Sequence, residues 1–141
     1  MLNRLVYFSE RACDDAAIGG FMGEAARRNR SRNITGLLMT DERSFIQILE
    51  GPRGAVSSLF QEISRDPRHH GIVLVEMTEI AAPSYPLWGM AHVSDPERID
   101  DAWRRVMRHR SEPWPLTAFQ LRGLLKIAMG GAVTAPALSV A

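Results

Sequence analysis

The chain has 141 residues, of which 45% are hydrophobic, and this suits one domain with a core and a short extension. Seventeen basic and sixteen acidic residues give a formal charge of +1, which offers no overall attraction for nucleic acid or an anionic membrane. The single cysteine, Cys13, excludes an intramolecular disulfide, and the sequence has no signal segment and no apolar run of membrane-spanning length. We therefore expect a cytoplasmic protein that binds neither nucleic acid nor membrane.

The first predicted elements are a strand and a helix. Residues 3–9 read as a strand, and the helix that follows is capped by Asp14 or Asp15. An apolar stripe at helical spacing marks the inward side of this helix: Ile18, Phe21, Met22 and Ala25. Asn29 continues the stripe, four residues after Ala25, so we expect its amide to point toward the core.

The remaining strands are predicted at four places: residues 34–40, 44–50, 72–77 and 88–93. The first two are joined by a tight turn at Asp41-Glu42-Arg43, and a second helix begins at Gly54. Residues 72–77 are apolar on both faces, which predicts a central strand. The order βαββαββ is an α+β fold of ferredoxin-like type, with two helices on one face of the sheet.

Two more helices are predicted in a C-terminal helical hairpin over residues 95–130, followed by a disordered tail over residues 131–141. The first helix has Pro96 at its first position and an apolar side made of Ile99, Trp103, Val106 and Met107. The second begins at Thr117, which forms a capping box with Gln120. Either this hairpin or another subunit must cover the free face of the sheet, and we expect a homo-oligomer, a dimer or larger.

A glutamine lies in the middle of an apolar strand. Gln47 has apolar neighbours on both sides, so both faces of the strand are covered and the amide is predicted to be buried. An unpaired buried amide costs about 1–3 kcal/mol, so Gln47 needs specific hydrogen-bond partners. Taken singly, Gln47 is typical of a satisfied core amide, Tyr7 of a packing residue and Asn29 of a helix C-cap.

Five short motifs in order resemble the BLUF family of blue-light receptors that use flavin. These motifs are Tyr7-Phe8-Ser9, Asn29 before Ile34-Thr35-Gly36-Leu37-Leu38, Phe45-x-Gln47-x-Leu49-Glu50-Gly51, Asp66-Pro67-Arg68-His69 and Trp88-Gly89-Met90. The resemblance covers residues 2–93 and implies a flavin-binding domain over residues 1–94. The C-terminal helices resemble those of short members without an enzymatic output domain, which implies a photosensory signalling protein and not an enzyme.

The resemblance implies a flavin held non-covalently between the two helices and the sheet, usually FAD, with FMN as the alternative. It implies that Tyr7 gives an electron and a proton to the excited flavin, and that Gln47 relays the proton and then changes its hydrogen bonds. It further implies that Asn29, Arg68 and His69 bind the flavin.

The last strand is where the resemblance places signal transmission. It implies that Trp88 or Met90 passes the change to the C-terminal helices and from there to a separate partner protein. Many family members have an arginine shortly before this tryptophan, whereas here the segment reads Pro83-Ser84-Tyr85-Pro86-Leu87. We expect photochemistry to survive this departure, with altered dark recovery or signal transmission.

Other interpretations stay open. One is a ferredoxin-like interaction module without an active chromophore, and another is an acylphosphatase-like enzyme that uses Arg11 and Asn33, although the loop at 9–14 lacks glycines to wrap a phosphate. Adjacent His69 and His70 point to opposite faces of a strand, so no metal site is predicted. A basic run could contact flavin phosphates or form a solvated helix end: Arg27, Arg28, Arg30 and Arg32.

Overall fold

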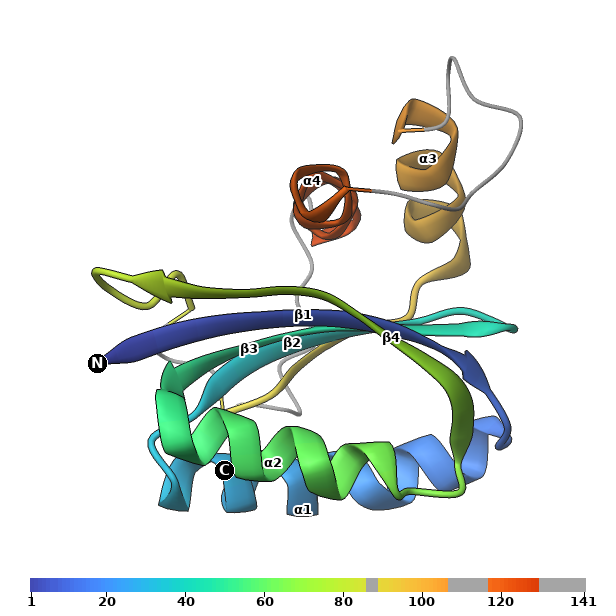
Figure 1. The fold of residues 1–141 in the computed structure, drawn as a ribbon. Coiled ribbons are helices and arrows are strands. Elements are labelled where there is room, and N and C mark those ends of the chain that lie inside the picture. Colours follow the sequence, from blue (N-terminus) through green and yellow to red (C-terminus); the bar gives the residue numbers. More distant parts are fainter. Residues whose placement is uncertain (86–88, 107–116, 130–141) are drawn as a thin grey trace.

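A computed structural model describes residues 1–85, 89–106 and 117–129 of the chain (Figure 1). The elements in chain order are β1 (Leu2–Arg11), α1 (Asp15–Ser31), β2 (Thr35–Thr40), β3 (Ser44–Pro52), α2 (Arg53–Ser64), β4 (His69–Ile80), β5 (Ala91–Val93), α3 (Pro96–Val106) and α4 (Ala118–Met129). This order confirms the predicted βαββαββ arrangement with two further helices. None of the described helices has both the length and the apolar composition of a membrane span.

The five strands form one sheet in the order β4-β1-β3-β2-β5. All neighbours are antiparallel except β2 and β5, which run parallel. The register places Tyr7 in β1 opposite Gln47 in β3, and Gln47 opposite Leu38 in β2. Residues paired directly across neighbouring strands point to the same face, so these three side chains lie together on one side of the sheet.

The prediction of a central strand at residues 72–77 was wrong. β4 is twelve residues long and lies at the edge of the sheet, where β1 is its one partner among the described strands. Three of its apolar side chains stay largely exposed: Val73 at 44%, Leu74 at 48% and Met77 at 39%. An apolar run shows that a strand is favourable, but it does not determine how many neighbours the strand has. The predicted last strand is also shorter, because β5 begins only at Ala91.

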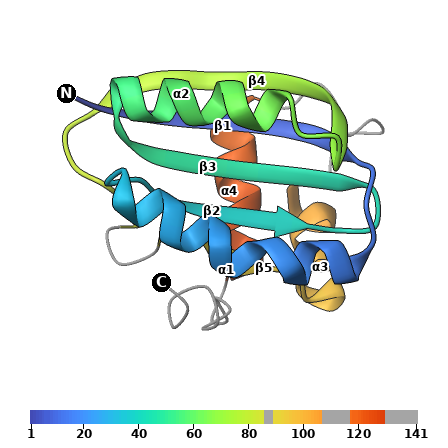
Figure 2. The ribbon, with the colours of Figure 1, turned by 90° about the horizontal axis from the view of Figure 1, so that it is seen from below.

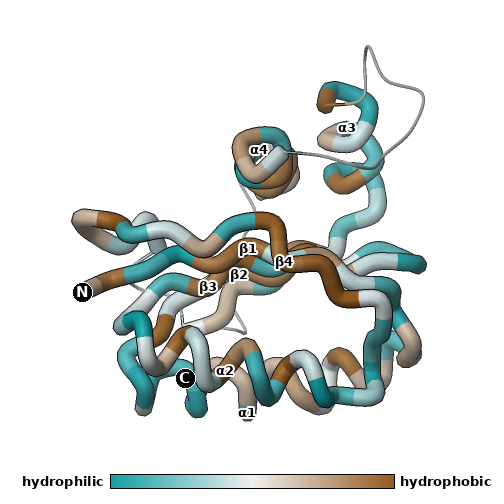
Figure 3. Tube along the Cα trace, in the orientation of Figure 1, coloured by the Kyte–Doolittle hydropathy of each residue, from teal (hydrophilic) through white to brown (hydrophobic). Residues whose placement is uncertain are grey.

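Helices cover both faces of the sheet. Figure 2 shows α1 and α2 lying side by side over one face, with α4 behind the sheet. On the other face the hydrophobic side of α4 points toward the strands (Figure 3), where its Leu121, Leu124 and Leu125 are fully buried. Each buried leucine contributes about 1.5–3 kcal/mol of hydrophobic stabilisation. The chain's own C-terminal helices therefore cover the face for which we had expected either this hairpin or another subunit.

Side-chain caps fix where two of these helices begin. The carboxylate of Asp14 accepts from the backbone N–H of Ala17 at 2.9 Å, which selects Asp14 over Asp15 as the cap of α1. At α4 the Thr117 hydroxyl accepts from the backbone N–H of Gln120, and the Gln120 side chain accepts from that of Thr117. The predicted capping box is thus confirmed.

Candidate functional site

A cavity lies between α1, α2 and the sheet face that carries Gln47. Its walls are largely apolar and come from α1, α2 and the central strands, with Phe21, Leu38, Phe45 and Leu59 among them. Nearly all predicted site residues line it: Tyr7, Asn29, Gln47, Arg68, His69 and Met90. Trp88, the remaining one, lies outside the described residues.

A hydrogen-bonded chain of three side chains borders this cavity. The Tyr7 hydroxyl donates to Gln47 Oε1 at 2.5 Å, and Gln47 Nε2 donates to the sulfur of Met90 at 3.4 Å. All three side chains are buried. A thioether sulfur is a weak acceptor, so the amide N–H groups of Gln47 are held loosely on that side. Gln47 therefore joins a phenol on β1 to the residue that directly precedes β5.

The phenol of Tyr7 is held in its neutral form. Burial raises the pKa of Tyr7 far above its ordinary value, and the carboxylate of Asp66 raises it further. The hydroxyl proton therefore stays on the phenol in the resting site and points to the amide oxygen of Gln47.

Asn29 presents an unpaired acceptor to the cavity. Its Nδ2 donates to the backbone oxygen of Gly89 at 2.9 Å, whereas its Oδ1 is buried without a hydrogen-bond partner among the described residues. A Cβ added at Gly89 would lie 2.6 Å from the backbone oxygen of Ala26, so only glycine allows this close approach to α1. An orphaned buried oxygen costs about 1–3 kcal/mol, which indicates that a bound group with a donor completes this site.

The arginines at the end of α1 have different surroundings. Arg28 lines the cavity, and its buried Nε has no hydrogen-bond partner in the described part of the chain. Arg32 instead forms an ion pair with Glu62 on α2, with 3.0 Å between Nη2 and Oε1. Nothing in the sequence favoured Arg28 over Arg32 as a cavity residue. The two differ only in how the packing of α1 turns them toward or away from the cavity.

Arg68 and His69 are anchored by protein groups. The guanidinium of Arg68 donates to both oxygens of Asp66 and lies 4.3 Å from the ring centre of Phe21. Its hydrogen bond lowers the pKa of Asp66 below the ordinary value. The ring nitrogens of His69 are bonded to the Ser9 hydroxyl and the Ile63 backbone oxygen, each at 2.6 Å. His69 thus offers the cavity the surface of its ring.

The residues considered for a phosphate-cleaving site do not form one. Arg11 donates to the backbone oxygens of Cys13 and Asp41, both at 2.8 Å, and to the carboxylate of Asp15. Its guanidinium is therefore used to tie the end of β1 to the neighbouring turn and helix. Asn33 has a φ of 58° and follows the end of α1, a turn position that asparagine tolerates better than most residues.

Sequence reasoning missed most of the cavity wall. Leu38, Phe45, Leu59 and Ile63 line the cavity, yet their spacing is that of ordinary core residues. Wall and core cannot be separated by periodicity, because both kinds of position face inward. Apolar walls, the unpaired amide oxygen of Asn29 and the weakly bonded amide of Gln47 together suit a flat aromatic group whose edge carries both N–H and C=O groups, as the ring of a flavin does.

Comparison with known proteins gives one consistent family. The sequence model of BLUF, described as sensors of blue light using FAD, matches residues 2–91. The photoactivated adenylate cyclase subunit beta of Euglena longa is 38% identical over 87 residues, which are 60% of this chain and 10% of that protein. The chain therefore spans about a tenth of that relative's length.

Two solved structures are similar over nearly their whole length. The photo-activated state of BlsA is 27% identical and has a TM-score of 0.82, covering 95% of this chain and 99% of the other. BlrB, a BLUF protein in its dark state, is 32% identical with a TM-score of 0.73, covering 88% of this chain and 95% of the other. The similarity thus extends beyond residues 2–91, which the family model matches, to the C-terminal helices.

Proposed function

This chain belongs to the BLUF family of blue-light sensors that use FAD, and from that premise we propose that it detects blue light through a flavin bound non-covalently in the cavity under α1 and α2. The observation that carries the proposal is the buried chain from Tyr7 through Gln47 to Met90. Asn29 supports it with an unpaired oxygen that suits an N–H on the ring edge. Arg28, Arg68 and His69 border the same cavity.

The photochemistry needs an oxidisable ring and a proton path beside the cavity. A flavin held there would supply absorption of blue light and an excited state able to accept an electron from a nearby donor. Tyr7 is the tyrosine of the cavity wall, and its hydroxyl proton becomes strongly acidic once the phenol loses an electron. The proton then passes to Gln47 Oε1, to which the hydroxyl already donates.

Gln47 turns this proton movement into a change of hydrogen bonding. An amide both donates and accepts, so a rotated or tautomerised side chain offers different groups to Tyr7, to the cavity and to Met90. The weak bond to the Met90 sulfur is the easiest of these to exchange. Since Met90 directly precedes β5, we assign it the step that passes the change to the last strand and the C-terminal helices.

The same proposal covers the identity of the flavin and how the protein signals. We assign FAD as the flavin, the one that the family description names, with FMN as the alternative to be decided by chromatography of the released cofactor. The chain acts as a photosensory switch and not as an enzyme, in the cytoplasm and as a homo-oligomer, and it signals to a separate protein through α3 and α4. A two-state switch of this kind changes populations and performs no turnover.

The test is a set of visible spectra taken in darkness, directly after blue illumination and during recovery. We expect a flavin spectrum with a small, reversible red shift. Tyr7→Phe and Gln47→Leu should both keep flavin and lose the stable shift. Tyr85→Phe is the matched control, because Tyr85 is the other of the two tyrosines and packs against the core on the α4 side of the sheet.

Two results would contradict the proposal in different ways. A wild-type photocycle in Tyr7→Phe would show that another donor serves the flavin. A wild-type protein that holds no flavin even after reconstitution would leave a ferredoxin-like interaction module as the better description.

A further inference from the structure

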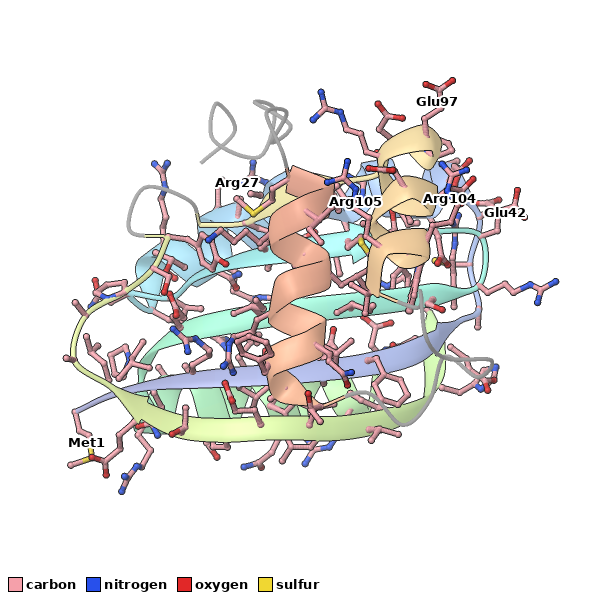
Figure 4. The ribbon with its side chains drawn as sticks, turned by 90° about the horizontal axis from the view of Figure 1, so that it is seen from above. Met1, Arg27, Glu42, Glu97, Arg104 and Arg105 are labelled. Atoms are coloured by element: carbon pink, nitrogen blue, oxygen red, sulfur yellow. The ribbon has the colours of Figure 1, made fainter. Side chains whose placement is uncertain are left out.

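A charged cluster lies on the face of the sheet opposite the cavity. Figure 4 shows α4 crossing this face. On the same face the side chain of Glu50, in β3, is completely buried. Its carboxylate accepts from Arg4 Nε at 2.9 Å and from the backbone N–H of Ser84 at 2.6 Å. A buried carboxylate is tolerated only with partners of this kind, so the pair fixes Ser84, in the connection between β4 and β5, to the central strands.

Arg4 stands between two carboxylates. Its Nη2 donates to the Ser84 hydroxyl at 3.0 Å, and its Nη1 lies 3.9 Å from Oε1 of Glu76 in β4. The other oxygen of Glu76 accepts from Arg122 of α4. Opposite charges therefore alternate from β3 to α4 in the order Glu50, Arg4, Glu76, Arg122, and the link between Arg4 and Glu76 is longer than a hydrogen bond.

The open distance between Arg4 and Glu76 gives Arg4 a second possible hydrogen-bond partner. Oε1 of Glu76 is buried and has no hydrogen-bond partner among the described residues. An approach of about 1 Å would bring Nη1 of Arg4 within hydrogen-bond distance of it. That bond would recover desolvation energy at Glu76 while weakening the hold of Arg4 on Ser84. The two arrangements differ by the exchange of one contact, as a bistable element requires.

The connection between β4 and β5 joins this cluster to the photochemical site. Met90, near the start of β5, contacts the amide of Gln47, and Ser84, earlier in the same connection, contacts Arg4 and Glu50. Residues 86–88 lie outside the described part of the chain, but Gln47 and Glu50 also share β3, where they are three residues apart. The bond from Arg122 to Glu76 then connects that cluster to α4.

We propose that Arg4 and Glu76 are positioning residues that pass the state of Gln47 to α4. When Gln47 changes its bonds and Met90 moves, the Ser84 contact loosens, Arg4 turns to the open oxygen of Glu76, and the bond between Glu76 and Arg122 weakens. The packing of α4 on the sheet is thereby loosened in the light. This inference rests on the proposed function, because it requires Gln47 to change its hydrogen bonds under illumination.

The test is hydrogen exchange of α4 peptides in full-length, flavin-loaded protein, measured by mass spectrometry in darkness and under blue light, with the flavin spectrum recorded in the same samples. In the wild type we expect light to increase exchange in α4. In Arg122→Gln the dark exchange should already equal the lit level, so that the light-dependent difference is lost while the red shift remains. Arg122→Lys, which keeps the charge, should retain a difference.

Two further variants isolate the route. Arg105→Gln is the matched control, because Arg105 pairs with Asp101 inside the single helix α3 and should leave the light response unchanged. Ser84→Ala removes the hydroxyl that accepts from Arg4 without altering α4, and it should also reduce the light-dependent difference.

The outcomes separate this inference from the function on which it rests. A wild type without a red shift contradicts the photoreceptor itself. A red shift with no exchange difference in wild-type α4 overturns the inference alone. If Arg122 has only a structural role, α4 exchange in Arg122→Gln should rise by the same amount in darkness and in light. The difference between light and darkness would then remain, and this result also overturns the inference.

Discussion

The two faces of the sheet bury polar groups of different kinds. Toward α1 and α2 the buried groups are the neutral amides of Asn29 and Gln47, one with an unpaired oxygen and the other bonded to a weak sulfur acceptor. Toward α4 they are carboxylates bonded to arginines, with Glu50 buried and Glu76 partly buried. A neutral amide can exchange partners at small cost, whereas a buried charge that loses its partner costs several kcal/mol. Groups on the first face can therefore exchange partners at small cost, whereas on the second face any exchange must keep each carboxylate paired with an arginine.

The largest effect is expected when the arginine of the charged face is removed. Arg4→Met removes the arginine from the buried Glu50 carboxylate and leaves it the Ser84 N–H, and we expect a loss of about 3–5 kcal/mol in the free energy of unfolding. Urea denaturation measures it. Adding Glu50→Gln to Arg4→Met should recover part of the loss, because the remaining group is then neutral. Arg105→Met, which removes an exposed ion pair with Asp101, is the control. An equally small loss of stability in Arg4→Met would show that the buried Glu50 carboxylate does not need Arg4 as its partner.

A smaller effect is expected where the cavity face depends on close backbone contact. Gly89→Ala places a methyl group 2.6 Å from the Ala26 oxygen, so the segment before β5 must move away from α1. We expect about 1–3 kcal/mol of destabilisation. The bond from Asn29 to Gly89 should weaken too, so flavin affinity falls, as fluorescence titration of the apoprotein would measure.

Gly20→Ala is the control for that substitution, since a Cβ there meets nothing within 4 Å. In the interior of α1 it should stabilise the protein by up to about 1 kcal/mol through helix propensity. Equal behaviour of the two variants would mean that the contact at Gly89 does not constrain the site.

The smallest effect concerns pH at β5. Burial, and then the positive charge of Arg11, lowers the pKa of His92 below its ordinary 6.5, and its Nε2 is hydrogen-bonded to Thr40 Oγ1 at 2.8 Å. Because the unfolded chain takes up the proton first, this contribution to stability is present above pH 6.5 and is lost as the pH falls toward the lower folded pKa. His92→Gln should flatten the pH dependence of unfolding below pH 6.5, and an unchanged slope would exclude His92 as its source.

Local patterns were sufficient for the elements and for part of the site. The caps at Asp14 and at Thr117 with Gln120 are confirmed, because a cap depends on residues within one turn. Burial of Gln47 followed from its apolar neighbours in the strand. Its partners did not follow, since Tyr7 lies 40 positions away and meets it only through the β1–β3 register.

The succession of strands and helices along the chain, the inward-facing positions and the family could all be predicted from the sequence. Each of them depends on spacing and on motifs along the chain. The tertiary structure alone decided that β4 lies at the edge, that Arg28 and not Arg32 lines the cavity, and that Glu50 is a buried charge between Arg4 and Ser84. The physical reason is that periodicity determines which way a side chain points, whereas its partners depend on strand order and register between distant segments.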